Sequence, residues 1–272
     1  MGKLQILVPT MHQDNIDLVD RMNIKCDTVI ANQADRNEIT YHVRGNATIK
    51  MITTDTRGVG LNRNIGLLAS TAEILLFSDD DMRYYDDAES VVLDAFRRYE
   101  AADVIIFGVN LTRGGSVVSG NSVKDGKRHL WNSLRYGTSA VAVKRESVLK
   151  HNITFHQCFG GGCIYGSGED SLFIKACFDH GLKVYGSSSV LGETSTDSST
   201  WFTGYNEKYF YDKGALMNYL FPVMKYPMAG YFSLNFKHPD ETTIGFLRRL
   251  DLYMKGIRGG KKLIPYSEYI RR

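Results

Sequence analysis

The 272-residue sequence predicts an α/β fold, with a mostly parallel sheet flanked by helices and a C-terminal helical extension. Short, continuously apolar runs alternate with helical patterns along most of the chain, and strands buried on both faces of a parallel sheet produce such runs. The hydrophobic and charged fractions, 43% and 23%, are those of an ordinary globular protein. A chain of this length can bury a full core without disulfides or metals.

The first hundred residues establish the alternation of strand and helix. The expected strands cover residues 5–9, 28–31, 49–53 and 74–78, and the expected helices cover residues 15–22, 62–70 and 86–99. Asp14 or Asn15 is a suitable N-cap for the first helix. A glycine-rich turn at residues 57–60 precedes the second helix.

The second part of the chain continues the pattern with longer irregular segments. The expected strands cover residues 104–107, 139–143 and 183–185, and one further helix runs from Glu169 to His180. Residues 112–128 are predicted to form a loop or an exposed hairpin, and residues 192–204 a loop. The simplest organisation is a catalytic domain at residues 1–210 followed by an aromatic and basic extension at residues 211–272.

Three consecutive acids, Asp79, Asp80 and Asp81, follow the apolar run at residues 74–78. Carboxylates this close at the mouth of a buried strand repel one another unless a cation lies between them. Hard divalent cations prefer oxygen ligands, and Mg²⁺ bound by one or two carboxylates usually shares its other positions with phosphate oxygens. The run therefore predicts a Mn²⁺ or Mg²⁺ site and a phosphate-bearing substrate. A solvated helix start is the alternative.

Polar residues at the ends of the first two strands lie where an open α/β sheet presents side chains to a ligand. Thr10 ends the first strand, and Gln33 and Asp35 end the second. They are candidates for contacts with a nucleotide, while Arg57 and Arg63 are candidates for contacts with phosphates. A surface charge on a helix is the alternative interpretation of Arg63.

Asp170 is the candidate general base. It follows a glycine-rich loop at residues 159–168 and opens a helix, whose positive end favours an ionised carboxylate. Glu169 beside it would orient Asp170 or the acceptor, although both acids could simply satisfy a helix N-terminus. Trp201 and Tyr205 are acceptor-side candidates because aromatic faces suit sugar rings; the alternative is that they belong to the core.

The end of the chain is basic and apolar. Residues 245–272 contain eight Lys or Arg residues and only two acids, interleaved with large apolar side chains. Such a segment fits the surface of an anionic membrane. A terminal helix packed on its own domain with a solvated basic face fits equally well.

Two further features of the sequence bear on the cellular compartment of the protein. No apolar stretch approaches the roughly 18 residues that a membrane span needs, and the sequence shows no signal peptide, so we expect a cytoplasmic protein. The four cysteines, at positions 26, 158, 163 and 177, lack the spacing of a zinc site and are expected to be reduced thiols.

Taken in order, four segments resemble the family 2 glycosyltransferases of the GT-A fold, over roughly residues 4–211. Residues 5–10 are similar to the opening strand of that family, and residues 58–66 are similar to its glycine-rich segment that ends in Arg-Asn-x-Gly. Residues 74–81 resemble the strand that carries the DxD motif. Residues 168–173 resemble the Glu-Asp motif on the acceptor side.

The resemblance implies transfer of a sugar from a nucleotide diphosphate, usually a UDP-sugar, with inversion at the anomeric carbon. Asp81, assisted by Asp79, would hold Mn²⁺ or Mg²⁺ on the diphosphate, and Asp170 would deprotonate the acceptor hydroxyl. The residues that would contribute to nucleotide binding are Thr10, Gln33, Asp35, Arg63, Asp79 and Asp80. The second strand departs from the family pattern, because Asn-Gln-Ala-Asp at residues 32–35 replaces consecutive acids.

The acceptor is expected to be a saccharide. The family's Gln-x-x-Arg-Trp motif for processive synthesis is absent, which predicts one sugar added per encounter. Residues 198–210 resemble small bacterial members that build surface polysaccharides, whose acceptors are often lipid-linked saccharides on the inner leaflet. That resemblance would give the segment at residues 245–272 a role as a peripheral membrane contact.

Two other functions remain open. A sugar-nucleotide nucleotidyltransferase shares the sheet and the metal acids, but it normally has a glycine-rich basic loop after the first strand, where this chain has Met-His-Gln-Asp at residues 11–14. A non-catalytic scaffold that binds a nucleotide sugar or a glycan would not need the intact acids Asp79, Asp81 and Asp170.

Overall fold

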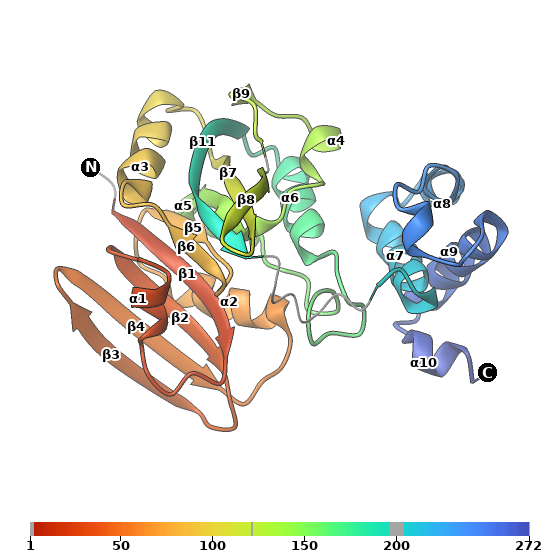
Figure 1. Ribbon diagram of the computed structural model, residues 1–272, viewed down its shortest axis with the longest axis horizontal. Helices are drawn as coiled ribbons and strands as arrows, with labels where there is room; N and C mark the ends of the chain where they lie inside the picture. The colour runs from red at the N-terminus through yellow and green to blue at the C-terminus, as the bar shows by residue number, and fades with distance from the viewer. Residues whose placement is uncertain (1–2, 121, 196–203, 272) are drawn as a thin grey trace. The chain divides into compact units, whose positions relative to one another are not determined.

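The structure is a computed structural model that describes residues 3–120, 122–195 and 204–271 (Figure 1). Its contacts divide the chain into two compact units. The first unit comprises Met1–Arg57, Leu61–Phe155 and Phe173–Ser198, and the second comprises Gly58–Gly60, His156–Leu172 and Ser199–Arg272.

The first unit is built on a mixed sheet. In the described part of the chain its strands are β1 (Leu4–Met11), β2 (Asp27–Gln33), β3 (Glu38–Arg44), β4 (Ala47–Thr54), β5 (Ile74–Phe77), β6 (Met82–Tyr84), β7 (Val104–Arg113), β8 (Ser116–Gly120), β9 (Gly126–Lys127), β10 (Val141–Lys144) and β11 (Val184–Ser195). The order across the sheet is β3-β4-β2-β1-β5-β10-β7-β11-β6, with β8 paired to β7 and β9 paired to β11.

The predicted parallel arrangement is found in the centre of the sheet. Strands β4, β2, β1 and β5 run parallel to one another, and β11 runs parallel to β7. Antiparallel strands complete the sheet: β10 lies between β5 and β7, and β3 and β6 form the two edges. The α/β fold class is confirmed, with a sheet that is mixed rather than mostly parallel.

Helices cover the sheet of the first unit and make up most of the second. The helices between the strands are α1 (Leu18–Arg21), α2 (Val59–Ala69), α3 (Ala88–Arg98), α4 (Leu130–Ser133), α5 (Arg145–Lys150) and α6 (Glu169–Asp179). The C-terminal helices are α7 (Glu207–Leu220), α8 (Lys225–Leu234), α9 (Phe246–Gly260) and α10 (Tyr266–Tyr269), with 3₁₀ turns at Thr138–Ala140 and Pro239–Glu241. None of the helices in the described residues is long and apolar enough to cross a membrane.

The core of the first unit lies on both faces of the sheet. Successive residues of β5 belong to different apolar clusters: Leu76 packs with Ile6 and Leu191 on one face, while Phe77 packs with Leu7 on the other. A strand covered on both faces must be apolar throughout, which is why β5 reads as an unbroken apolar run. The rigid sheet fixes the ends of its strands, where the candidate donor residues lie.

The second unit is held together by close helix packing. A Cβ atom built on Gly256 of α9 would lie 2.0 Å from the carbonyl oxygen of Tyr211 in α7, and one built on Gly214 would lie 2.3 Å from that of Tyr253. Only glycine allows two helices to approach this closely at these points. One face of the basic C-terminal segment therefore packs on its own unit.

Several local expectations need correction. The first helix is one turn, Leu18–Arg21, rather than residues 15–22, and β11 continues to Ser195 through the start of the expected loop at 192–204. Residues 116–120 pair with β7 as the exposed hairpin that the sequence allowed. Strands β3 and β6 were not expected at all.

Candidate functional site

In the first unit, the parallel strands bring three chain segments to one edge of the sheet. Thr10 of β1 pairs in register with Asn32 of β2, and β5 runs alongside β1 up to Phe77. The backbone N–H of Ser78 donates to the carbonyl oxygen of Leu7, so the chain leaves β5 beside the end of β1. This is the carboxyl edge, where open α/β sheets bind ligands.

Two of the candidate donor residues contact the acidic run directly. The hydroxyl of Thr10 donates to Oδ2 of Asp80 at 2.6 Å, and Nη2 of Arg63 donates to Oδ1 of Asp79 at 2.6 Å. The Arg63 side chain is only 5% exposed, and its guanidinium lies 5.3 Å from the centre of the Phe155 ring. A buried cation is thus placed at the end of β5, where the acids begin.

The effect of the neighbouring negative charges is clearest in the pKa of Asp81. Partial burial raises the pKa of its carboxyl, and the neighbouring Asp79 and Asp80 raise it further, against a hydrogen bond with the side chain of Thr194. A carboxylate that is destabilised by its like-charged neighbours gains the most from an added cation.

The end of β2 supplies a different arrangement. Gln33 is buried, and its carbonyl oxygen accepts a hydrogen bond from the backbone of His12. Nη2 of Arg57 donates to Oδ1 of Asp35 at 2.5 Å, in an ion pair that is largely exposed. Arg57, predicted to contact phosphates, therefore pairs with a carboxylate that was itself predicted to contact the nucleotide.

Asn62 was missed by sequence reasoning. It is 2% exposed, and its Nδ2 donates to the carbonyl oxygens of Ala31 at 2.7 Å and Thr10 at 3.2 Å. A side chain of α2 thereby ties together the ends of β1 and β2. The signal was its position beside Arg63 in the glycine-rich segment, but the partners become visible only in the fold.

The acidic run has suitable chemistry for a hard divalent cation. Within the residues that the structure describes, no group of three or more His, Cys, Asp or Glu side chains is arranged as a complete metal site. Mg²⁺ usually keeps several positions for water and phosphate oxygens and needs only one or two carboxylates. Asp79 and Asp81 supply carboxylates of this kind: Asp79 accepts a hydrogen bond from Arg63 through Oδ1. The Asp81 carboxyl, whose pKa is raised by burial and by the neighbouring acids, would be stabilised in its ionised form by a cation.

The second unit holds the predicted Glu-Asp pair at the start of α6. Glu169 is 8% exposed, and its Oε2 accepts the backbone N–H of Gly168 at 3.0 Å. A Cβ atom built on Gly160, which has φ of +108°, would lie 2.7 Å from the Glu169 carboxyl carbon. The glycine-rich loop thus wraps closely around this carboxylate. Asp170 follows it in the first turn of the helix.

Two charged residues of α7 that the sequence did not single out belong to the same unit. Burial lowers the pKa of Lys213, opposed by the nearby carboxylates of Glu169, Asp212 and Asp170. Asp212 is 4% exposed and accepts the backbone N–H of Gly166 at 2.9 Å, and it also pairs with a lysine one turn earlier. Lys213 therefore places a positive charge near the candidate general base Asp170.

The acceptor-side aromatic candidates have different outcomes. The ring of Tyr205 stacks on His238 at 5.0 Å between centroids and meets Phe236 edge-on. Trp201 lies outside the described residues. Tyr211, which shares the same aromatic segment of sequence, is fully buried and belongs to the core of the second unit.

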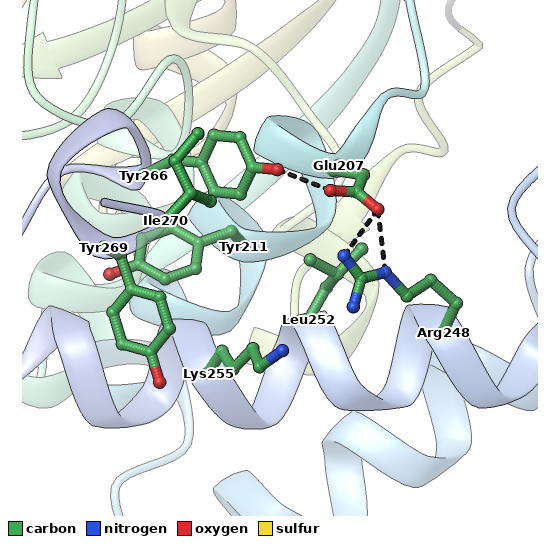
Figure 2. A pocket seen from close by; sticks show the side chains of 8 residues that line it. All are labelled: Glu207, Tyr211, Arg248, Leu252, Lys255, Tyr266, Tyr269 and Ile270. Carbon is green, nitrogen blue, oxygen red and sulfur yellow. Dashed lines mark hydrogen bonds and ion pairs between the residues drawn. The ribbon is translucent and has the colours of Figure 1, made fainter. Parts of the chain in front are cut away.

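A pocket of about 460 Å³ lies between α7, α9 and α10 in the second unit (Figure 2). Its lining residues are Glu207, Tyr211, Arg248, Leu252, Lys255, Tyr266, Tyr269 and Ile270. The Glu207 carboxylate accepts hydrogen bonds from the Tyr266 hydroxyl at 2.5 Å and from Arg248 at 2.7 Å, as Figure 2 shows. These bonds connect α7 to α9 and α10. The polar residues that line the pocket therefore serve to hold the three helices together, and no ligand is needed to explain them.

The predicted site residues thus fall into two groups. Thr10, Gln33, Asp35 and the three acids lie at or after strand ends of the first unit, and Arg63 lies on α2 in the same unit. Glu169, Asp170 and Tyr205 belong to the second unit.

Comparisons with known proteins agree with this architecture. The chain matches no curated protein in sequence. Among solved structures it resembles S. aureus TarS residues 1–349 in complex with UDP-GlcNAc, with a TM-score of 0.61 and 13% identity over 97% of this chain and 93% of that one. The same fragment in complex with UDP gives a TM-score of 0.58 and 14% identity over 96% and 83% of the two chains, and S. aureus TarS gives 0.61 and 15% over 97% and 50%. At these identities the likeness establishes the fold.

The family model described as glycosyl transferase family 2 matches residues 4–150, which span β1 to α5 and include the acidic run. This match covers more than half of the chain and agrees with the GT-A architecture of the structural neighbours. The chain therefore belongs to glycosyl transferase family 2 and is a glycosyltransferase.

Proposed function

We propose that the protein is a metal-dependent, inverting glycosyltransferase that moves a single sugar from a nucleotide-diphosphate sugar to a saccharide acceptor. The observation that carries the proposal is the convergence of Thr10 and Arg63 on the acidic run, each at 2.6 Å. The TarS structures contain UDP-GlcNAc and UDP, which supports a UDP-sugar as the donor. Residues 1–210 would carry donor binding and chemistry, and residues 211–272 the extension.

The donor would bind at the carboxyl edge of the sheet. Thr10, Gln33 and Asp35 would contact the nucleoside, because they lie at the ends of the two neighbouring strands β1 and β2. Asp79 and Asp81 would hold Mn²⁺ or Mg²⁺, which when bound neutralises the charge that develops on the diphosphate leaving group. Arg63 fixes the Asp79 carboxylate in place.

Asp170 would take the proton from the acceptor hydroxyl. The acceptor oxygen forms the new bond to the anomeric carbon, the bond from that carbon to the diphosphate oxygen breaks, and the nucleoside diphosphate leaves. Direct displacement of this kind inverts the anomeric carbon and needs only one general base on the protein. Glu169, held by the glycine-rich loop, orients the start of α6, and Trp201 and Tyr205 remain the candidates for acceptor contacts.

Donor binding can be tested by thermal stability, since a ligand that binds only the folded state raises the melting temperature. We expect UDP and one UDP-sugar to raise the melting temperature only when Mn²⁺ is present, and Asp81→Ala to remove the shift. Asp87→Ala, which changes an exposed acid at the start of α3, is the matched control and should keep it. No shift with any nucleotide in folded protein would refute the donor site and favour a glycan-binding scaffold.

The chemical step needs a separate experiment. Asp170→Asn is expected to lower the rate of UDP release with acceptor present by at least about 100-fold while the Mn²⁺-dependent thermal shift persists. Unchanged turnover would exclude Asp170 as the base. Formation of a sugar nucleotide from a nucleoside triphosphate and a sugar phosphate, with pyrophosphate released, would instead identify a nucleotidyltransferase.

We further propose that the enzyme works in the cytoplasm as a peripheral protein of the inner leaflet, on a lipid-linked saccharide. The support comes from apolar side chains that remain exposed in the second unit. Val223, Leu234 and Leu247 are 89%, 72% and 76% exposed, and they lie beside or within α8 and the first turn of α9. The buried side of α9 packs against its own unit and is not available to a membrane. We therefore propose that α8 and the start of α9, rather than the whole segment 245–272, contact the membrane.

Sedimentation with vesicles tests this surface without disturbing the packed face of α9. The full chain is expected to sediment with vesicles of anionic phosphatidylglycerol, and the double variant Leu234→Asp and Leu247→Asp to remain in solution. Val117→Asp, at a 58% exposed position on β8, should sediment like the unchanged protein. Equal binding by all three proteins would exclude this surface as the membrane contact.

A further inference from the structure

β3 is an edge strand with one side of its backbone available. It pairs with β4 in an antiparallel register that runs without interruption from Glu38 opposite Thr53 to Arg44 opposite Ala47. No other strand in residues 3–120, 122–195 and 204–271 pairs with β3. Its outer N–H and C=O groups therefore form a template for a further strand.

The side chains of β3 do not protect this edge. Ile39, Tyr41 and Val43 are 58%, 66% and 76% exposed, and because strand residues alternate between faces they lie on the same face. Natural edge strands are usually protected by charged residues, a proline or a bulge. The five residues from Ile39 to Val43 include no Lys, Arg, Asp, Glu or Pro, and the pairing with β4 shows no bulge.

The neighbouring strand extends the apolar face. Ile52 lies opposite Ile39 and is only partly buried, and the ammonium of Lys50 lies 5.7 Å from the centre of the Tyr41 ring. The exposed apolar strip at the border of the sheet thus consists of Ile39, Tyr41 and Val43 of β3 with Ile52 of β4, while Lys50 and Thr48 lie opposite Tyr41 and Val43. A strip of this kind, continuous with an open backbone edge, indicates a strand from another chain as its occupant.

We propose that β3 is a homodimer interface in which a second copy of the chain adds its own β3 antiparallel to the first, with the two-fold axis passing at Tyr41. The argument for a second copy is the self-complementarity of the strand sequence, Glu-Ile-Thr-Tyr-His-Val-Arg at residues 38–44. In this register Tyr41 faces Tyr41 of the second copy. Ile39 faces Val43, and Glu38 faces Arg44.

Each of these pairs is favourable. Aromatic and aliphatic cross-strand pairs, and opposite charges placed directly across a seam, each stabilise antiparallel pairing. A two-fold axis repeats the Glu38–Arg44 pair and the Ile39–Val43 pair on both sides of Tyr41, as an isologous interface requires. Arg44 already pairs with Asp20, and its guanidinium has further N–H groups for a second carboxylate.

The register makes a prediction that cross-linking can test. Cβ atoms directly opposite each other in antiparallel strands are about 4.5–5.5 Å apart, close to disulfide range. Tyr41→Cys should therefore form a covalent dimer on mild oxidation. Val43→Cys should not, because the two copies of position 43 lie on opposite sides of the axis. They are four residues of strand apart, or roughly 13 Å. A mixture of Ile39→Cys and Val43→Cys proteins should form the mixed dimer.

Native cysteines provide the background for that experiment. Cys26 and Cys177 are buried, and Cys158 and Cys163 are partly buried, so the unchanged protein oxidised in parallel should stay monomeric on a denaturing gel. Equal cross-linking of Tyr41→Cys and Val43→Cys would exclude the register. Absence of cross-linking by Tyr41→Cys and by the mixture would overturn the interface.

The oligomeric state gives an independent test. Sedimentation of the unchanged protein should show a reversible dimer, with dissociation in roughly the micromolar range because a single strand seam is small. Tyr41→Lys places two like charges at the axis and should yield a monomer of unchanged circular dichroism. Val117→Lys, at an exposed apolar position on β8, should still dimerise. A protein that stays monomeric up to about 100 µM would refute the proposal, whatever its enzymatic activity.

Discussion

Arg63 shows how one side chain connects the stability of the first unit to its candidate site. Its guanidinium is buried, lies over Phe155 and pairs with Asp79 at 2.6 Å. The cation offsets part of the repulsion among three consecutive carboxylates. Because Asp79 is itself 44% exposed, solvent screens the pair, and much of the effect of Arg63 comes from packing and from satisfying a buried charge.

Replacing Arg63 by Met is expected to destabilise the ligand-free protein by on the order of 2 kcal/mol, since it removes a buried partner of an acid in a like-charged run. Chemical denaturation measures the change. Arg83→Met is the matched control: that side chain is 66% exposed and lies 4.0 Å from Glu193, so its loss should cost less than about 0.5 kcal/mol. Equal effects of the two substitutions would contradict a special role for the buried guanidinium.

Lys213 is a charged side chain of the second unit that lies near candidate site residues, as Arg63 does in the first. Its amine lies among the carboxylates of Glu169, Asp170 and Asp212, and burial lowers its pKa. Lys213→Met is therefore expected to lower the rate of sugar transfer by about tenfold or more while leaving donor-dependent thermal shifts unchanged, because the positive charge near Asp170 is lost. Lys213→Arg should recover part of the rate. A normal rate in Lys213→Met would remove the lysine from the reaction.

At the scale of elements, the C-terminal helices rely on backbone contact and on one carboxylate. Gly256 lets α9 approach α7 until almost no space remains, whereas a Cβ atom on Gly230 of α8 would meet nothing within 4 Å. Glu207 joins α7 to α9 through Arg248 and to α10 through Tyr266 (Figure 2). These two features lead to different tests.

The glycines allow a matched comparison of alanine substitutions. Gly256→Ala should destabilise the protein by about 2–3 kcal/mol because its methyl group overlaps the Tyr211 carbonyl oxygen. Gly230→Ala should stabilise it by about 0.5–1 kcal/mol, since alanine is the better helix former and has free space there. Thermal or urea unfolding reports both. If both substitutions destabilise the protein, the space around each glycine does not determine the effect of the added methyl group on stability.

The Glu207 contacts predict a dependence of stability on pH. Hydrogen bonds from Arg248 and then Tyr266 lower the pKa of the Glu207 carboxyl in the folded state. Its contribution to stability is thus present above the ordinary pKa of a glutamate and is lost as the pH falls through the lowered value. Glu207→Gln should melt below the unchanged protein at pH 7, and the difference should be smaller at pH 3, which lies below the ordinary pKa of a glutamate. A difference that is the same at both pH values would contradict this assignment.

Some elements follow from sequence alone, and others depend on tertiary context. Strands such as β5 are predictable because burial on both faces demands an unbroken apolar run. β3 was missed because its apolar residues alternate and stay exposed, so a search for continuous runs passes over it. The roles of Asn62 and Lys213 could not be predicted, because their partners come from distant parts of the sequence.

For the whole molecule, the division into two compact units predicts where a donor acts. The candidate donor residues all lie in the first unit: most end or follow β1, β2 and β5, and Arg63 lies on α2. UDP with Mn²⁺ should therefore slow amide hydrogen exchange around residues 10, 33 and 79–81, and leave α8 and α9 unchanged. Mass spectrometry of peptides measures this, and Asp81→Ala is the control. Protection confined to the C-terminal helices would contradict a donor site at the sheet.

The pairing of β6 has a consequence for synthesis on the ribosome. The acidic run connects β5, whose partner β1 is made first, to β6, which pairs with β11 near Gly192. More than a hundred residues after β6 must therefore leave the exit tunnel before β6, which directly follows Asp79–Asp81, can pair with β11. Until then the nascent chain holds the three acids at one end only, so in our proposal the donor site would be complete only after β11 has been made.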